Sequence, residues 1–174
     1  MIVCLGWGSL IWSSETLPVV SEWQTDGPFL PVEFLRQSQD GKLTLVIDPA
    51  SKPLQTLWAE LEVRNLSDAV EQLRVREGRL LETKIGRWPN GNAYQFSDEV
   101  GNWAVSKGIT GVVWTALGPK FSGCNNRRPS QEEAVAYLSG LNDEKQQLAR
   151  AYIEKAHEQI DTDYRRAFKK SLGW

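Results

Sequence analysis

The sequence predicts an α+β fold, and three observations support this prediction. Short apolar or alternating runs bounded by turn residues are typical of strands, and stripes of apolar residues at a period of 3.6 are typical of amphipathic helices. Both patterns occur along the chain. Its 174 residues, with 41% hydrophobic content, suit one core, so we expect a single domain over residues 1–174.

The first strands are predicted from apolar runs and the turns that end them. Residues 2–7 form an apolar run that stops at Gly8-Ser9, as in a buried strand ending at a tight turn. Asp40-Gly41 separates the apolar-rich runs 32–38 and 43–48 and favours a hairpin, because both residues tolerate positive φ. Residues 55–63 alternate between apolar and polar side chains and predict another strand.

A helix of about ten residues is expected next, with Ser67 as its N-cap. By the 3.6-residue period, one stripe of this helix carries Leu66, Val70, Leu73 and Glu77. Gly78 is the expected C-terminal stop. The pattern therefore places a carboxylate at the end of the face that packs on the sheet.

The middle of the chain predicts more strands and one helix. Strands at 83–88 and 93–96 flank Asn90-Gly91, a second hairpin signal. A short helix at 97–107 precedes a β-rich run at 109–117.

The C-terminal part predicts helices. Ser130 and Glu133 form a capping box that opens a helix toward Gly140, and Asp143 with Gln146 offers a similar start for the next helix. That second helix is expected to pack by residues four apart, namely Leu148, Tyr152, Ala156 and Ile160. A last amphipathic segment carries Tyr164, Phe168 and Leu172.

Charge and hydropathy argue against two classes of partner. The 20 basic and 22 acidic residues leave a net charge of −2, without a long run of either sign, so we expect no nucleic acid and no membrane as partner. The apolar segment 1–11 lacks a basic lead-in and a cleavage pattern. No window approaches the roughly 20 apolar residues of a spanning helix, and a cytoplasmic location is expected.

Metal and triad chemistry have little support. Cys4 and Cys124 are too few for a disulfide framework or a zinc cluster, and we expect both as reduced thiols. His157 is the one histidine, so a two-histidine metal site and a Ser-His-Asp or Cys-His pairing cannot be assembled. We expect no metal and no cofactor.

Three segments are candidates for chemistry. Small residues in the segment 6–12, Gly-Trp-Gly-Ser-Leu-Ile-Trp, can expose backbone N–H groups that bind a carboxylate; the alternative is an ordinary turn. Burial would make Glu77 usable as an acid and a base near neutral pH. The alternative for Glu77 is a frayed helix end, paired with Arg74 or an arginine elsewhere.

The third segment is 118–129, rich in glycine, asparagine, proline and arginine and without periodicity. It indicates a surface loop able to change conformation, a candidate lid. Arg127 in this loop could present its guanidinium to an anionic ligand. The alternative is a set of solvated side chains.

Residues 5–12, Leu-Gly-Trp-Gly-Ser-Leu-Ile-Trp, resemble the opening signature of gamma-glutamylcyclotransferase-like proteins, in particular the ChaC-like branch. That signature usually has tyrosine where this chain has Trp7. Residues 73–78, Leu-Arg-Val-Arg-Glu-Gly, are similar to the family segment whose glutamate is catalytic. Residues 152–156 followed by Tyr164 are a weaker match to the family's C-terminal helices.

The resemblance implies a small β-barrel flanked by helices, with a pocket at its mouth and no cofactor. Trp7, Gly8, Ser9 and Leu10 would bind a gamma-glutamyl substrate, with Tyr164 and Arg127 as further candidates, and Glu77 would transfer the proton. The product would be 5-oxoproline, released from gamma-glutamyl amino acids, gamma-glutamylamines or glutathione.

Two other classes of function stay open. One is a non-catalytic domain that binds a small carboxylate with the same turn. The other is a tryptophan-rich interaction surface, which would require several of four side chains to be exposed together: Trp23, Trp58, Trp88 and Trp103.

Overall fold

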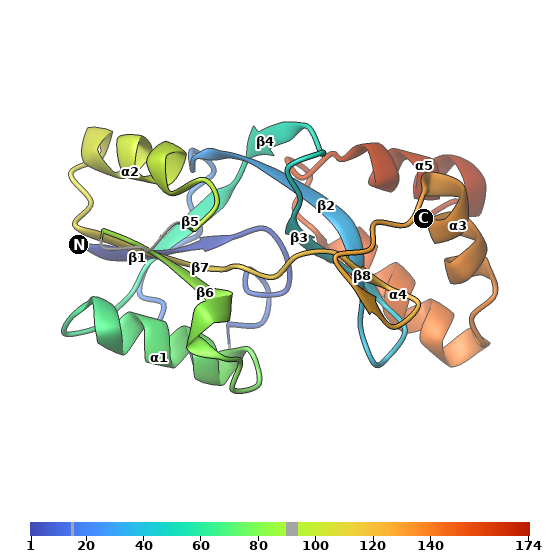
Figure 1. Cartoon of the computed structure of the whole chain (residues 1–174), viewed down its shortest axis with the longest axis horizontal. Coiled ribbons are helices and arrows are strands. Elements are labelled where there is room, and N and C mark those ends of the chain that lie inside the picture. Colours follow the sequence, from blue (N-terminus) through green and yellow to red (C-terminus); the bar gives the residue numbers. More distant parts are fainter. Residues whose placement is uncertain (15, 90–93) are drawn as a thin grey trace. The chain divides into compact units, whose positions relative to one another are not determined.

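The computed structural model describes residues 1–14, 16–89 and 94–174 (Figure 1). The chain divides into two compact units. Unit 1 comprises Met1–Leu30 and Gln55–Leu117, and unit 2 comprises Pro31–Leu54 and Gly118–Trp174. Helices and a mixed sheet occur in both, so the predicted α+β class is confirmed. The single domain stays a prediction.

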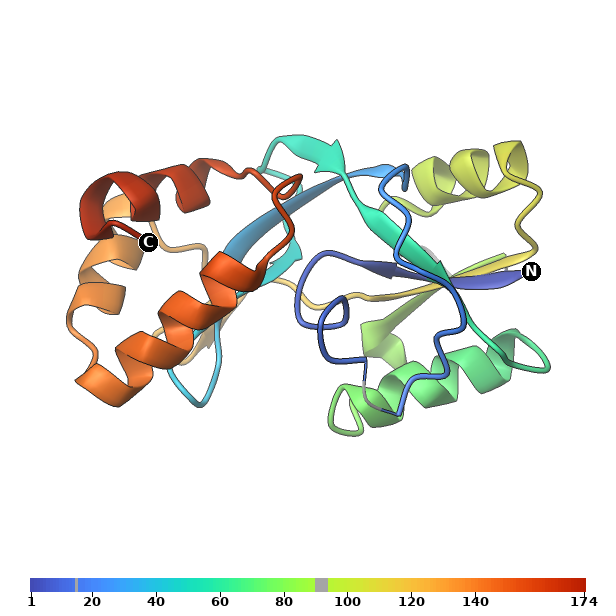
Figure 2. The ribbon, with the colours of Figure 1, turned by 180° about the vertical axis from the view of Figure 1, so that it is seen from behind.

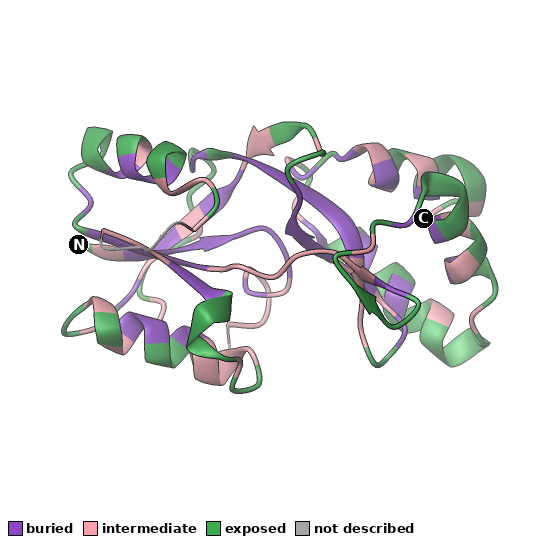
Figure 3. Cartoon of the chain, in the orientation of Figure 1, coloured by how far each residue is buried: buried purple, intermediate pink, exposed green. Residues whose placement is uncertain are grey.

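The sheet of unit 1 has the order β5-β1-β7-β6. Its strands are β1 (Ile2–Gly6), β5 (Leu57–Glu60), β6 (Ile85–Trp88) and β7 (Gly111–Thr115). β1 is parallel to β7 and antiparallel to β5, and β6 is antiparallel to β7. Consecutive residues Val3, Cys4 and Leu5 are fully buried, because β1 is a central strand covered on both faces. This burial, which Figure 3 shows along β1, is why the sequence of the strand is an unbroken apolar run.

Helix α1 (Leu66–Arg76) packs on one face of this sheet and α2 (Ser97–Ser106) on the other (Figure 1). A 3₁₀ turn, η1 (Glu82–Lys84), leads into β6. The predicted N-cap of α1 is wrong by two residues. The side chain of Asn65 accepts a hydrogen bond from the amide of Asp68, and Asn65 is as good a cap as Ser67.

The predicted strand at 93–96 is wrong where it can be judged, because Gln95 and Phe96 form a turn before α2. Phe96 has a φ of 67°, a left-handed conformation that ends an extended chain. Ala93 and the Asn90-Gly91 hairpin signal lie outside the described residues.

The sheet of unit 2 has the order β3-β2-β8-β9, with β4 also paired to β2. Its strands are β2 (Phe29–Gln37), β3 (Leu43–Ile47), β4 (Pro53–Gln55), β8 (Lys120–Phe121) and β9 (Cys124–Asn125). The predicted hairpin at Asp40-Gly41 is confirmed: β2 and β3 are antiparallel, and Gly41 has a φ of 91°.

Residues 118–129 are only partly the loop that the sequence predicts. β8 and β9 form a small hairpin within them, and Ser122 and Gly123 both have positive φ. Two positive φ values are what a tight two-residue hairpin turn requires. Ser-Gly was therefore a turn signal that the absence of periodicity hid.

The closed barrel is a wrong expectation for the residues that the structure describes. They form two open mixed sheets. The sheet of unit 1 has β5 and β6 as edges, and β8 and β9 in unit 2 have only two residues each. Strands this short cannot supply the continuous ladder that closes a barrel.

The helices of unit 2, orange to red in Figure 2, are α3 (Gln131–Ser139), α4 (Asp143–Lys155) and α5 (Asp163–Leu172). The predicted capping box at Ser130 and Glu133 is confirmed by both of its hydrogen bonds. For α4 the cap is Asn142, one residue before the predicted start.

Aromatic contacts hold α4 and α5 on the sheet of unit 2. Phe34 of β2 lies edge-on to Tyr152 of α4 and to Phe168 of α5, with ring centroids 6.2 and 5.9 Å apart. The predicted stripe on α4 is wrong at both ends. Leu148 is 45% exposed, and the helix ends at Lys155, so that Ala156 is its C-cap and Ile160 lies in the loop before α5, although both are buried. Of the four residues, Tyr152 is the one that lies on α4 and is buried.

A buried carboxylate, Glu33, lies between β2 and the start of α5. Its side chain accepts hydrogen bonds from the amides of Phe34 (2.8 Å) and Tyr164 (3.2 Å), and the residue is 2% exposed. Burial raises its pKa above the ordinary value of 4.5, and hydrogen bonds from Thr162, Phe34 and Tyr164 oppose the rise.

We predict that Glu33→Gln changes how stability depends on pH. A folded-state pKa above the unfolded value means that the folded chain binds the proton more tightly. The free energy of unfolding of the wild type should therefore fall relative to that of Glu33→Gln as pH rises from about 4.5 to neutrality. Urea unfolding at both pH values measures this. An equal difference at the two pH values would contradict it, and Glu158→Gln, at an exposed position on the same unit, is the control.

Candidate functional site

The candidate site lies in unit 1, where β1 ends in the turn formed by residues 7–10. Trp7 and Leu10 are 5% and 6% exposed, so two large apolar side chains anchor the turn to the core. Gly8 between them is buried, and Ser9 is half-buried. The short polar side chain of Ser9 is thus the part of the turn that reaches outward.

Three successive amide groups of the turn take no part in the backbone hydrogen bonds that close it. It is closed by hydrogen bonds from the amide of Ile11 to the carbonyl of Gly8 (3.0 Å) and from the amide of Ser13 to the carbonyl of Ser9 (2.9 Å). Within the described part of the chain, the amides of Gly8, Ser9 and Leu10 make no such backbone bond. Consecutive N–H groups without acceptors are suited to bind an anion.

Glu77 lies where the helical period predicts it. It is the C-cap of α1, its amide donates to the carbonyl of Leu73 (3.0 Å), and Gly78 follows with a φ of 75°. Val70 and Leu73 on the same stripe are buried. The side chain of Glu77 is 18% exposed, so its carboxylate is half-buried at the edge of the core and solvent can still reach it.

Arg76 connects Glu77 to the turn after β1. Its Nη1 lies 2.5 Å from Oε1 of Glu77, its Nη2 lies 3.2 Å from the hydroxyl of Ser9, and its Nε lies 3.2 Å from the carbonyl of Ser13. One guanidinium therefore separates the carboxylate of Glu77 from Ser9. The structure thus brings together the two segments that the sequence singled out.

Arg76 was not among the site residues predicted from the sequence. The sequence left open a pair between Glu77 and Arg74 or an arginine elsewhere. Arg74 pairs with Glu71, at 2.7 Å, and the partner of Glu77 is Arg76. Arg76 directly precedes Glu77, and neighbours on a helix point about 100° apart, so helical periodicity gave no reason to place their side chains together.

Cys4 lies in β1 close to this ion pair. Burial raises the pKa of its thiol, the negative charge of Glu77 raises it further, and the positive charge of Arg76 partly offsets the rise. The thiol therefore stays protonated at neutral pH and is a poor nucleophile.

The other two predicted site residues belong to unit 2, where both have partners. Tyr164 is 3% exposed, and its hydroxyl donates to the carbonyl of Pro129 (2.5 Å). Arg127 pairs with Glu133, and its guanidinium lies 4.9 Å from the ring centroid of Phe121. Their role in substrate binding stays a prediction.

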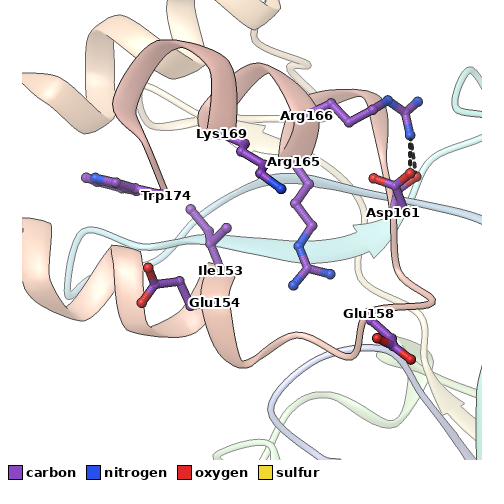
Figure 4. A pocket seen from close by; sticks show the side chains of 8 residues that line it. All are labelled: Ile153, Glu154, Glu158, Asp161, Arg165, Arg166, Lys169 and Trp174. Atoms are coloured by element: carbon purple, nitrogen blue, oxygen red, sulfur yellow. Dashed lines mark hydrogen bonds and ion pairs between the residues drawn. The ribbon is translucent and has the colours of Figure 1, made fainter.

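Unit 2 also has a cavity of about 370 Å³, and Figure 4 shows the side chains that line it: Ile153, Glu154, Glu158, Asp161, Arg165, Arg166, Lys169 and Trp174. Arg166 pairs with Asp161, and Arg165 donates to the carbonyls of Ala156, His157 and Ile160. Both arginines are already bound to residues of the loop between α4 and α5. The cavity is therefore a weaker candidate for a functional site than the turn after β1.

The tryptophan-rich surface gains no support. Trp23, Trp58, Trp88 and Trp103 are each half-buried. The indole rings of Trp58 and Trp103 contact each other edge-on at 5.7 Å, and Trp58 donates to Asp26. These rings therefore pack against their own unit.

Across the described ranges, no helix is long and apolar enough to cross a membrane. The same residues contain no group of three or more His, Cys, Asp or Glu side chains that could hold a metal ion.

The comparisons with known proteins add no relative. No family model matches the chain, and neither a curated protein nor a solved structure matches it.

Proposed function

We propose that this chain is a gamma-glutamylcyclotransferase-type enzyme, which cleaves gamma-glutamyl amides by ring closure and releases 5-oxoproline. Its membership of the ChaC-like branch belongs to the same proposal and rests on residues 5–12 and 73–78. The single observation that carries the proposal is the half-buried carboxylate of Glu77, which Arg76 holds beside Ser9, in the turn whose amides donate no backbone hydrogen bond among the described residues.

The turn suits the α-carboxylate of a glutamyl group. The amides of Gly8, Ser9 and Leu10 would donate to that carboxylate, as successive N–H groups do in other anion sites. Trp7 is buried beneath the turn, and its indole can donate a hydrogen bond but not accept one. Any hydrogen bond that a tyrosine hydroxyl makes to a ligand at this position is therefore lost or replaced in this chain.

Glu77 is suited to transfer a proton because one of its oxygens is free. Arg76 contacts Oε1, and among the described residues no hydrogen-bond donor contacts Oε2. In the proposed reaction Glu77 takes a proton from the α-ammonium of the substrate. The freed amine attacks the γ-carbonyl carbon, the bond to the leaving amine breaks, and Glu77 returns the proton to that amine.

Positioning supplies much of the rate enhancement, because nucleophile and electrophile belong to one molecule. Holding them in a reactive geometry can contribute roughly 7 kcal/mol. The hydroxyl of Ser9 accepts a hydrogen bond from Arg76, which leaves its own proton to donate to the developing oxyanion. The reaction assigns no step to a metal.

A panel of gamma-glutamyl compounds tests the proposal. The wild-type chain is incubated with gamma-glutamyl amino acids, gamma-glutamylamines and glutathione, and 5-oxoproline is sought by mass spectrometry. We expect release from at least one class, and the co-product identifies the leaving group. Absence of 5-oxoproline from every class would overturn the proposal.

A second candidate is a non-catalytic domain that binds a small carboxylate. The ion pair between Arg76 and Glu77 favours it, because such a pair can serve structure alone. Calorimetric titration of the same panel separates the two candidates. Binding by the wild type without 5-oxoproline release would favour the binding domain.

A further inference from the structure

The guanidinium of Arg76 contacts both halves of the proposed site. Its Nη1 donates to Glu77, and its Nη2 donates to the hydroxyl of Ser9 and to the carbonyl of Ser13, which Nε also reaches. The three contacted residues come from the end of α1 and from the segment that follows β1. Every nitrogen of this side chain is therefore used within the site.

We propose that Arg76 is the positioning residue of this site, which aims the carboxylate of Glu77 at the turn formed by residues 7–10. This inference rests on the proposed function. A guanidinium is planar, and its donors have a fixed fork geometry. When one edge is fixed to Ser9 and Ser13, Nη1 is held in place, and its hydrogen bond to Oε1 restricts the positions that the carboxylate of Glu77 can take.

Burial makes this arrangement persistent. The side chain of Arg76 is 9% exposed, and that of Glu77 is 18% exposed. A charge at such a position is costly unless it is paired and hydrogen-bonded. Arg76 therefore keeps its contacts rather than exchanging them with water, as exposed ion pairs readily do.

Arg74 gives a matched comparison two residues earlier on the same helix. It also forms an ion pair, to Glu71, but the side chain of Glu71 is 54% exposed and this pair lies outside the turn. A substitution of Arg74 removes the same charge from α1 without touching Ser9, Ser13 or Glu77.

The experiment compares Arg76→Gln, Arg76→Lys and Arg74→Gln with the wild type, using the substrate found in the panel. For Arg76→Gln we expect kcat to fall about 100-fold with KM changed by less than about threefold, because misplacement of a catalytic group affects the chemical step. Lysine restores the charge but not the planar fork. The kcat of Arg76→Lys should therefore be about tenfold above that of Arg76→Gln and still about tenfold below that of the wild type. Arg74→Gln should stay within about twofold of the wild type.

Two comparisons separate positioning from a purely structural effect. A fall in kcat with little change in KM, partly recovered by lysine, indicates a misplaced catalytic group rather than an unfolded site. Wild-type kcat in Arg76→Gln would overturn the inference. If Arg76→Gln fails to fold by circular dichroism, Arg76→Lys decides, and wild-type kcat in that variant overturns it.

A readout without turnover keeps this inference separate from the proposed function. Loss of the Arg76 contacts should speed hydrogen exchange at the amides of Ile11 and Ser13, which close the turn, and Arg74→Gln should leave it unchanged. Unchanged exchange in Arg76→Gln would contradict the inference whether or not a substrate is found. Absence of 5-oxoproline with the wild type would instead contradict the proposed function.

Discussion

Glu77→Gln is expected to lower kcat for 5-oxoproline release by about 1,000-fold, within the range that general acid and base catalysis contributes. Glutamine has nearly the same shape and can still accept the hydrogen bond that Arg76 donates to Oε1. It cannot take the proton of the α-ammonium, so the amine stays unreactive. Initial rates over a range of substrate concentrations separate kcat from KM, and KM should change little.

Glu71→Gln is the matched control for this substitution. Glu71 is a carboxylate on the same helix whose side chain is 54% exposed and paired with Arg74. Its loss should change kcat by less than about twofold. A kcat for Glu77→Gln close to that of Glu71→Gln would remove Glu77 from the mechanism.

The largest expected effect on stability is that of Gly86→Ala. Gly86 of β6 stands directly opposite Trp114 of β7, and a Cβ atom added there would lie 2.1 Å from the indole ring. Trp114 is 1% exposed, so its ring has no free space to enter. Overpacking of this kind costs about 3 kcal/mol of unfolding free energy, which urea unfolding of the whole chain measures.

Gly108→Ala is the control in the same unit. No atom lies within 4 Å of its added Cβ, but its φ of 67° disfavours a side chain. This strain costs about 1 kcal/mol. Comparing the losses of unfolding free energy in the two variants therefore tests whether the clash with Trp114 destabilises Gly86→Ala. A loss for Gly86→Ala no greater than that for Gly108→Ala would show that Trp114 adapts to the added methyl group.

The local features of the fold could be predicted because their signals are local. Asp40-Gly41 sets its own turn, and the capping box of Ser130 and Glu133 is satisfied within four residues. Strand pairing could not be predicted in the same way. β1 pairs with β7, and Ile2 lies opposite Gly111, but an apolar run carries no information on which distant run it joins.

The candidate site also combines a local feature that the sequence predicts with a long-range contact that it does not. The helical period placed Glu77 after Val70 and Leu73 on a packed stripe, and the structure has it there. The contact between Arg76 and Ser9 joins residues 67 positions apart, so only the folded chain shows it. No local sequence pattern links Tyr164 or Arg127 to Glu77, so the sequence could not predict whether they lie near it.

Ring closure, rather than hydrolysis, is the central claim, and the reaction in H₂¹⁸O tests it most directly. In ring closure the α-amine of the substrate attacks the γ-carbonyl, and no water enters the product. We predict 5-oxoproline without ¹⁸O, formed by the wild type and not by Glu77→Gln. Glutamate carrying one ¹⁸O in its γ-carboxylate would contradict the claim, because it would show that water is the nucleophile.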